Sequence, residues 1–508
     1  MSKMRQDAAV TTDRRSYLWL ALGTVLLAFS TGQSSVAFAA WLAPVFLIRF
    51  FRSRRAGRGY LLLLLALYVA YAVAWRSAMS FDIFEQWIPY LLLVVVMALN
   101  GSIPFLADRL LAPRLKGFAA TFAFPLAAVA NWYIYGLISP MGSFGTTGYE
   151  QYSNGALIQL ASVTGLWGLT FLVSWFGPVV NWAWERSFDW AKIRRGVVAF
   201  TCVVALALLF GGLRLSFVFP EAETVRAHGV SLSDEATGEA PEDLYTNEAA
   251  YRRVTQELTD LFFEATIREA RAGAQIVLWP EQATGVTGGD LDALLARASR
   301  VARERGIYLA MGMEVRFFDG EQEPENRLIV VDPAGEIIID HLKYGAAGIS
   351  GIRQGEYVVE TADTPYGTLA GIICWDADFP STVNQAGRKG ADILLVAVAE
   401  PIEAVADLHA RQSVFRAIEN GVSLVRQDAA GGWSLTTDPY GRVLAAVDNR
   451  RTSERVMVAQ VPTHRAFTLY SVIGDLFAWL CAVGFVGILV VAVVGGRKSA
   501  PPPDDDVR

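Results

Sequence analysis

The stretch Gly371-Ile-Ile-Cys374-Trp-Asp376 places a cysteine at the end of an apolar run of strand length. Residues 368–373 are mostly small or apolar, which predicts a buried β-strand. On α/β scaffolds, functional side chains usually lie at or just beyond the ends of strands. Cys374 is therefore a candidate nucleophile, and Trp375 follows it with a backbone N–H that can stabilise an oxyanion.

Two further strand ends carry the groups that a thiol nucleophile needs. Ile276-Val-Leu-Trp-Pro-Glu281 ends in a carboxylate, and Asp340-His-Leu-Lys343 directly follows the apolar run 336–339. A neutral thiol is a poor nucleophile, so a neighbouring carboxylate must take its proton. A fixed ammonium favours the thiolate and stabilises the oxyanion formed at an attacked carbonyl. Singly, each of these residues is more often structural, but their order and shared placement favour one common site with Cys374.

The surrounding residues, from about 221 to 465, have the pattern of an α/β domain. Short apolar runs of strand length alternate with helical patterns, and two Asp-Pro-x-Gly turns separate pairs of strands. The expected strands are residues 275–279, 307–311, 328–331, 336–339, 368–373 and 393–398, and the expected helices are 247–271, 291–305 and 408–420. This alternation predicts helices packed on the faces of two sheets.

The rest of the chain is strongly apolar. Of the 508 residues, 53% are hydrophobic and only 19% are charged, and the apolar residues crowd into the first 220 and last 40 positions. This asymmetry predicts a membrane portion beside a soluble portion. The net charge of −6 argues against nucleic acid as a partner.

Eight apolar runs approach the length of about 20 residues with which a helix crosses a bilayer. Seven precede the soluble block and one follows it, and the second and third are short. The runs are residues 17–29, 36–51, 60–75, 87–106, 118–137, 156–182, 196–217 and 469–494. The sequence therefore predicts a multi-span helical membrane bundle with about seven transmembrane helices before the soluble domain.

Lys and Arg fill alternate loops between these runs. They precede the first run and follow the second, fourth, sixth and eighth, whereas loops 32–35, 77–86 and 138–154 are nearly free of them. The positive-inside rule then places both termini in the cytoplasm and the soluble domain outside. The expected order is a cytoplasmic tail (1–16), a membrane domain (17–219), an extracytoplasmic catalytic domain (220–465), a transmembrane helix (466–495) and a disordered cytoplasmic tail (496–508).

Several of these segments resemble a known enzyme family. Trp279-Pro-Glu281, Lys343 and Ile373-Cys374-Trp-Asp376 are similar to the Glu–Lys–Cys segments of the nitrilase, or carbon–nitrogen hydrolase, superfamily. Phe415-Arg-Ala-Ile-Glu419-Asn-Gly421 also resembles that superfamily. In the membrane portion, Tyr149-Glu-Gln-Tyr-Ser-Asn154 looks like the apolipoprotein N-acyltransferase family. The resemblance covers nearly the whole chain, in the same order and topology.

The resemblance implies a nitrilase-type α-β-β-α sandwich on a helical bundle in the bacterial inner membrane. The implied activity moves an acyl chain from a membrane phospholipid, through a thioester on Cys374, to the amine of a diacylglyceryl-cysteine at a lipoprotein's amino terminus. Glu281 would be the general base and Lys343 the oxyanion stabiliser, with Trp375 and Asp376 as further oxyanion or substrate-binding candidates. Phospholipid and diacylated lipoprotein are the implied partners, and the chemistry requires no metal or diffusible cofactor.

The loop after Lys343 departs from the family pattern. The family usually carries a second glutamate a few residues beyond this lysine, but residues 344–351 contain none. Glu356 lies thirteen positions past Lys343 and would serve as substrate-binding carboxylate only if the loop folds back; a solvated charge is the alternative. The Gly- and Ala-rich loop 345–351 is expected to act as a lid at the membrane surface.

Two other functions remain open at this point. One is a membrane-tethered amidase that hydrolyses C–N bonds with the same triad. The other is a degenerate homologue that binds lipoproteins without turnover, an alternative motivated by the altered loop. A protected apolar path from the bilayer to Cys374 would favour acyl transfer, whereas a water-open pocket would favour hydrolysis.

Overall fold

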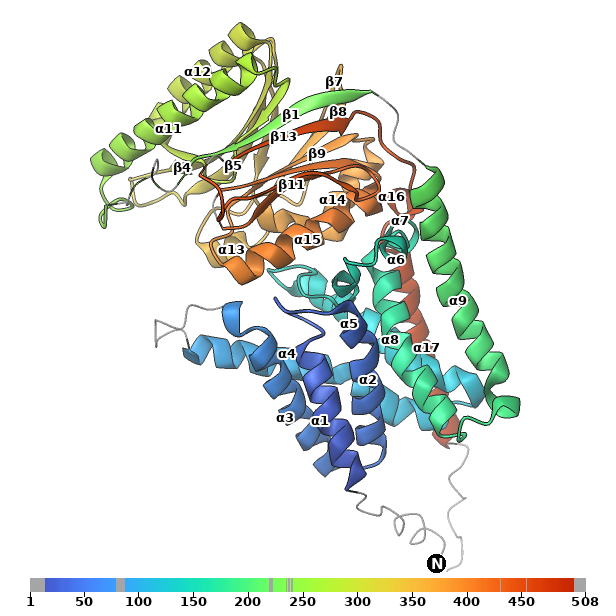
Figure 1. Ribbon diagram of the computed structural model, residues 1–508. Coiled ribbons are helices and arrows are strands. Elements are labelled where there is room, and N and C mark those ends of the chain that lie inside the picture. The colour runs from blue at the N-terminus through green and yellow to red at the C-terminus, as the bar shows by residue number, and fades with distance from the viewer. Residues whose placement is uncertain are drawn as a thin grey trace, which may run out of the picture.

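The protein consists of a bundle of long helices and an α/β sandwich that lies on one end of it (Figure 1). The computed structural model describes residues 14–78, 87–218, 223–233, 235, 238, 241–429, 431–453 and 455–497. Nearly all of the two predicted tails, 1–16 and 496–508, lies outside these residues, so the disorder expected for residues 496–508 remains a prediction. The predicted combination of a helical membrane bundle with a nitrilase-type sandwich is confirmed.

A helix occupies each of the eight predicted apolar runs. Among the described residues, five helices are long and apolar enough to cross a membrane: Ala56–Ala74, Trp87–Arg114, Gly117–Ile138, Trp190–Phe217 and Leu476–Val494. The bundle helices are α1 (Arg15–Ala28), α2 (Ala37–Arg52), α3 (Ala56–Ala74), α4 (Trp87–Leu111), α5 (Ala123–Ile138), α8 (Leu166–Trp184), α9 (Trp190–Phe217) and α17 (Leu476–Arg497).

Two of the predicted runs are broken by glycines in left-handed conformations. In the sixth run, the short helices α6 (Gly155–Ile158) and α7 (Ala161–Thr164) precede α8. Gly165, which lies between α7 and α8, has φ +64°. A Cβ at Gly165 would lie 2.4 Å from the ring of Tyr470, so the close packing there requires glycine. In the last run, α16 (Leu469–Ile473) ends at Gly474, which has φ +57°, before α17 begins. Both predicted spans therefore start later than expected.

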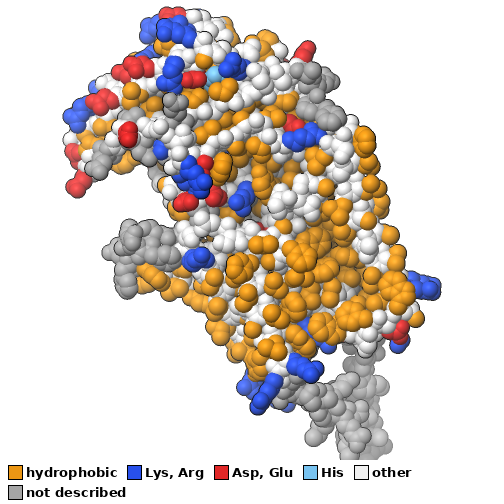
Figure 2. Space-filling model, in the orientation of Figure 1, with side chains coloured by type: hydrophobic (Ala, Val, Ile, Leu, Met, Phe, Trp, Pro, Cys, Tyr) orange, Lys and Arg blue, Asp and Glu red, His pale blue; other side chains and the backbone are white. Residues whose placement is uncertain are grey.

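The surface of the bundle is apolar over most of its length. Hydrophobic side chains cover the bundle in Figure 2, and Lys and Arg gather at its far end and over the α/β domain. Leu18, Leu61, Leu206 and Val483 are each more than 60% exposed. Contiguous exposed apolar surface of this extent marks a membrane-facing region, as the sequence predicts.

The α/β domain contains two sheets packed face to face. The first has the order β13-β1-β2-β4-β5-β6, with β3 also paired to β4, and the second has the order β12-β11-β10-β9-β8-β7. The strands are β1 (Thr224–Ser231), β2 (Ile276–Leu278), β3 (Thr284–Thr287), β4 (Tyr308–Arg316), β5 (Glu325–Val331), β6 (Ile337–Leu342), β7 (Thr361–Thr364), β8 (Gly367–Ile373), β9 (Ile393–Val398), β10 (Ser423–Asp428), β11 (Trp433–Thr437), β12 (Val443–Asp448) and β13 (Arg455–Pro462).

Helices cover both outer faces of this pair of sheets. Helices α11 (Glu248–Arg271) and α12 (Leu291–Arg305) pack on the first sheet, with Phe262 and Ala298 in one apolar core. Helices α14 (Pro380–Arg388) and α15 (Glu403–Asn420) lie on the second sheet, on the side that faces the bundle (Figure 1). The strands at the centre of each sheet are parallel and fully buried, as expected when helices cover the outer faces.

The second sheet therefore presents the carboxyl ends of β8 and β9 near the junction with the membrane bundle. The loop between α5 and α6 forms part of this junction, because the Ser143 backbone N–H donates to the Asp378 carbonyl at 2.7 Å. At Gly142, with φ +54°, a Cβ would lie 2.2 Å from that same carbonyl. The bundle and the strand ends are thus in direct contact at the place where the sequence predicts chemistry.

Candidate active site

Cys374 stands at a sharp turn between β8 and a short 3-10 helix, η7 (Cys374–Asp378). Its side chain is buried and its backbone has φ +46°, a left-handed conformation that a residue with a side chain rarely adopts. Such strain persists only where the surroundings impose it, and it clusters at functional sites. The backbone N–H of Trp375 lies in the first turn of η7, where a helix offers its N–H groups no internal acceptor.

Glu281 follows β2 and reaches the same place from the first sheet. Its carboxylate accepts hydrogen bonds from Lys343 Nζ at 2.5 Å, Asn326 Nδ2 at 2.7 Å and the Ala399 backbone N–H at 2.9 Å. The carboxylate is buried, and a buried charge requires such partners. Glu281 is thereby held in one position beside Lys343, where its charge also acts on the thiol of Cys374.

Lys343 lies directly after β6, which extends three residues further than the apolar run predicted. Burial by itself lowers the pKa of the Lys343 ammonium, but the negative charge of Glu281 and the nearby Cys374 outweigh burial and raise that pKa. Lys343 therefore carries its positive charge in the resting enzyme. A buried cation beside the nucleophile is suited to an oxyanion that forms there.

The thiol of Cys374 does not rest as a thiolate. Burial raises the pKa of the Cys374 thiol well above its ordinary value, and the charge of Glu281 raises it further, whereas Lys343 opposes this. The expectation that the fixed ammonium favours the thiolate is thus outweighed by burial. The thiol has to lose its proton to Glu281 as it attacks, which is general-base catalysis.

The Asp376 carboxylate holds together the chain segments that carry Lys343 and Cys374. One of its carboxylate oxygens accepts from the backbone N–H groups of Tyr344 at 3.0 Å and Gly345 at 2.6 Å. The other lies 2.7 Å from His341 Nε2 and accepts from the Ile373 N–H at 2.9 Å. All of its acceptor capacity serves the protein, so the structure gives Asp376 a positioning role in place of the expected substrate or oxyanion contact.

The loop after Lys343 is only partly free to move. Residues 344–347 are buried, and at Gly345 a Cβ would lie 2.5 Å from the Trp375 backbone. The Ala346 N–H donates to the Pro140 carbonyl of the membrane portion at 3.1 Å. The predicted lid is therefore wrong for residues 345–347, which are pinned, and only residues 348–351 are exposed.

Glu356 does not join the triad. The loop does fold back, since the Gly355 N–H donates to the Lys343 carbonyl at 2.8 Å. The Glu356 side chain is nevertheless exposed, whereas Glu281, Lys343 and Cys374 are buried. The structure thus favours the solvated-charge interpretation of Glu356.

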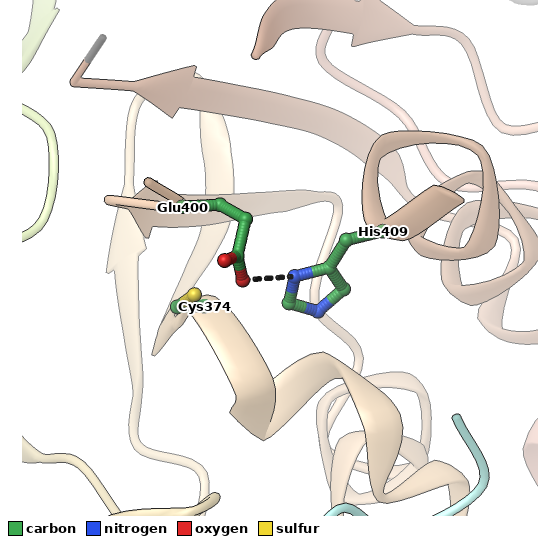
Figure 3. Close-up of side chains that lie close together, drawn as sticks. All are labelled: Cys374, Glu400 and His409. Carbon is green, nitrogen blue, oxygen red and sulfur yellow. Dashed lines mark ion pairs between the residues drawn. The ribbon is translucent and has the colours of Figure 1, made fainter. Parts of the chain in front are cut away.

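A different carboxylate lies beside the nucleophile. Glu400 follows β9, is 5% exposed, and shares a cluster with Cys374 and His409 in which the ligand-type atoms all lie within 4.8 Å of one another (Figure 3). His409 comes from α15 and its Nδ1 lies 3.9 Å from Glu400 Oε2. No periodicity or motif singles out Glu400 in the sequence, but its place just past the end of a central parallel strand is a signal by which it could have been found. A metal ion held by these three groups would occupy the thiol, so we assign none to the cluster.

An apolar cavity of about 300 Å³ runs from the helices of the bundle to this cluster. Most of its wall comes from α1 to α5, including Leu93, Met97 and Ala128, and its other end is formed by Trp375 and Glu400. The ring of Trp375 packs on Phe144, with ring centroids 4.8 Å apart. The apolar passage from the membrane portion therefore ends beside Cys374, at Trp375 and Glu400.

Comparison with known proteins identifies relatives of both portions. The family model described as "Apolipoprotein N-acyltransferase N-terminal domain" matches residues 23–179, and the model described as "Carbon-nitrogen hydrolase" matches residues 249–467. The chain is 25% identical to the apolipoprotein N-acyltransferase of Geobacter metallireducens over 507 residues, 93% of this chain and 94% of the relative. It is 26% identical to that of Bradyrhizobium diazoefficiens over 445 residues, 78% of this chain and 77% of the relative. Among solved structures it is similar to an amidase from Nesterenkonia sp., with 22% identity and a TM-score of 0.39, over 49% of this chain and 95% of the amidase.

Proposed function

Because this chain belongs to the apolipoprotein N-acyltransferase family, we propose that it acylates the amino-terminal diacylglyceryl-cysteine of lipoproteins with an acyl chain from a membrane phospholipid. The observation that carries this function is the apolar cavity, which runs from the membrane bundle to Trp375 and Glu400, the neighbours of the buried thiol. Donor and acceptor are both held in a bilayer, so an enzyme that joins them needs such a passage.

In the first half-reaction, Cys374 attacks the ester carbonyl of the phospholipid. Glu281 accepts the proton of the thiol, and the Lys343 ammonium stabilises the oxyanion of the tetrahedral intermediate. The intermediate collapses when the lysophospholipid oxygen leaves with the proton that Glu281 returns. The products are a thioester on Cys374 and a lysophospholipid, and no proton is gained or lost.

In the second half-reaction, the amine of the diacylglyceryl-cysteine attacks the thioester. The same oxyanion contact serves the second tetrahedral intermediate, and the thiolate of Cys374 leaves and is reprotonated. The product carries an amide at the lipoprotein's amino terminus. Transfer rather than hydrolysis follows from the apolar wall of the passage, because an amphiphilic acceptor enters it more readily than water does. This favours the transferase over the membrane-tethered amidase.

The same proposal includes the domain borders and the sidedness inferred from the sequence. We propose that residues 17–219 and 466–495 lie in the bacterial inner membrane and that residues 220–465 lie outside it, with both termini in the cytoplasm. In support, the α2–α3 loop and the α8–α9 loop lie at the end of the bundle that is far from the catalytic domain (Figure 1), and Lys and Arg residues gather in these loops and in the adjoining helix turns.

Single cysteines on opposite sides test this arrangement. Glu264→Cys on the exposed face of α11 is expected to react with a membrane-impermeant maleimide in spheroplasts of a bacterial host. Gly57→Cys, exposed in the first turn of α3, is expected to react only after permeabilisation. The reverse pattern of labelling would invert the proposed topology.

Intact mass spectrometry of the detergent-purified enzyme tests the activity. After incubation with phospholipid, the wild type is expected to gain the mass of one acyl chain, and Cys374→Ala is expected to gain none, because the thiol is the nucleophile. Addition of a diacylated lipopeptide is expected to remove the acyl mass and to leave that mass on the peptide amine. Loss of the adduct with release of free fatty acid, and no acylated peptide, would instead establish a hydrolase.

A further inference from the structure

The two half-reactions differ in their proton balance. Forming the thioester from an ester moves one proton from the thiol to the leaving alcohol, and Glu281 suffices for it. The acceptor amine is an ammonium ion at neutral pH, so the second half-reaction is acyl–S–Cys374 + R–NH₃⁺ → acyl–NH–R + HS–Cys374 + H⁺. One proton returns to sulfur, and a second proton has to leave. Glu281 is occupied with the first, so the site needs another base.

Glu400 occupies the place that such a base requires. It lines the apolar cavity together with Trp375, and its carboxylate lies within 4.8 Å of the Cys374 sulfur. An amine that attacks a thioester on this sulfur has to come within bonding distance of the thioester carbon, so it passes beside Glu400. Figure 3 shows the Glu400 carboxylate between the thiol and the ring of His409.

His409 lies next to Glu400, on the side away from the thiol (Figure 3). Its ring is buried, its Nδ1 lies 3.9 Å from Glu400 Oε2, and its Nε2 lies 2.6 Å from Asp378 Oδ2. The ring of His409 thus stands between two carboxylates and closes the site behind Glu400. The rings of Phe144 and Trp375 flank it, which fixes its orientation.

We propose that Glu400, backed by His409, deprotonates the incoming ammonium of the acceptor and thereby serves only the aminolysis half of the reaction. This inference rests on the proposed function and deepens it, because it identifies a cationic amine as the acceptor that the site is built to receive. Glu281 then remains the base that exchanges a proton with the thiol. Glu400 takes the second proton, which the ammonium of the acceptor releases.

The electrostatic surroundings of Glu400 agree with this role. Burial raises the pKa of the Glu400 carboxyl above its ordinary value, the His409 ring opposes that rise, and the charges of Asp428 and Glu281 add to it. The Ile402 N–H donates to the carboxylate and stabilises its charged form. A carboxylate with a raised pKa is a better base for an ammonium than an ordinary glutamate is.

Glu400→Gln separates the two half-reactions. We expect the variant to form the acyl-enzyme from phospholipid, and we expect its rate of acyl transfer to a lipopeptide amine at pH 7 to fall by about 10²-fold, the size of a general-base contribution. Hydroxylamine is a neutral nucleophile at pH 7 and needs no prior loss of a proton. Deacylation by hydroxylamine is therefore expected to change far less than transfer to the lipopeptide.

The pH dependence of acyl transfer distinguishes a catalytic role of Glu400 from a structural one, because a purely structural role would not change the shape of the pH profile. In the wild type, single-turnover transfer to the lipopeptide is expected to rise with pH as Glu400 ionises, in a range above that of an ordinary glutamate. This rise with pH is expected to be absent in Glu400→Gln. Glu400→Asp is expected to show the same rise, with lower rates of transfer throughout. Glu403→Gln, at an exposed position three residues further on, is the matched control and is expected to behave as the wild type.

Three results would overturn the inference. These are lipopeptide transfer by Glu400→Gln at the wild-type rate, an equal loss with lipopeptide and hydroxylamine, and failure of the variant to form the acyl-enzyme. If the wild type itself forms no acyl-enzyme from phospholipid, the proposed function fails, and this inference fails with it. The two failures are thus distinguished by the first half-reaction of the wild type.

Discussion

Glu281→Gln is expected to lower the rate of acyl-enzyme formation by about 10²- to 10⁴-fold, because it removes the carboxylate to which we assign the proton of the thiol. The thiol of Cys374 is buried with a raised pKa, so it does not ionise spontaneously near neutral pH. Asn326 and Ala399 donate to different oxygens of the carboxylate, so the amide of Gln keeps an acceptor for one of them, and it cannot accept a thiol proton. Rapid-quench mass spectrometry of the acyl adduct measures the rate.

Two comparisons make this expectation specific. Glu264→Gln changes a glutamate on the exposed face of α11 and is expected to leave the rate unchanged. Thermal unfolding of Glu281→Gln in detergent establishes whether the variant is folded, since Lys343 loses its anionic partner there. A folded Glu281→Gln protein that forms the acyl-enzyme at the wild-type rate would show that another group takes the thiol proton.

The sequence located the three groups of the triad because each stands at the end of an apolar run. β2, β6 and β8 end beside Glu281, Lys343 and Cys374, and the ends of strands in two packed sheets meet at one edge. The α-β-β-α arrangement also followed from the alternation of helices and strands, and it is confirmed. Periodicity and turn chemistry are local signals, and both of these features depend on local signals.

The residues that complete the site depend on tertiary contacts, and their local signals are weak. Asn326 lies inside β5, in a run that looks like any buried strand, and only its pairing beside Lys343 brings it to Glu281. Glu400 sits in a short connection between β9 and α15, where a glutamate is usually solvated. Glu356 was a candidate only on the condition that the loop folds back; the loop does so, but the fold exposes Glu356 and buries Glu400.

The bounds of the membrane helices also depend on features that local sequence signals do not reveal. Hydropathy located each helix of the bundle, yet it cannot detect that Gly165 and Gly474 adopt left-handed conformations, because both lie within apolar runs. Those two breaks bring α7 and α16 against α15 of the catalytic domain. They therefore serve the junction between the two portions, which a one-dimensional measure of apolarity does not describe.

A buried ion pair at this junction leads to the second large effect. Arg416→Met is expected to destabilise the protein by about 3–5 kcal/mol, the cost of leaving one member of a buried pair unpaired. Arg416 and Glu419 on α15 are both 0% exposed, with Nη2 and Oε2 2.9 Å apart. Arg416 also donates to Tyr149 Oη at 3.1 Å, and Glu419 accepts from the Leu166 N–H at 2.8 Å at the start of α8. The pair therefore holds the catalytic domain to the bundle.

The double variant Arg416→Met/Glu419→Gln tests that explanation. Gln keeps an acceptor for the Leu166 N–H but carries no charge, so it removes the uncompensated carboxylate that the single variant creates. We expect the single variant to lower the unfolding midpoint in detergent by about 6–20 °C, from about 2–4 °C per kcal/mol for a domain of this size. The double variant is expected to regain at least about half of that loss. If the double variant is instead as unstable as Arg416→Met, the contact of Arg416 with Tyr149 and not its charge balance with Glu419 secures the junction, and the position of Cys374 relative to the membrane cavity would depend on that one hydrogen bond.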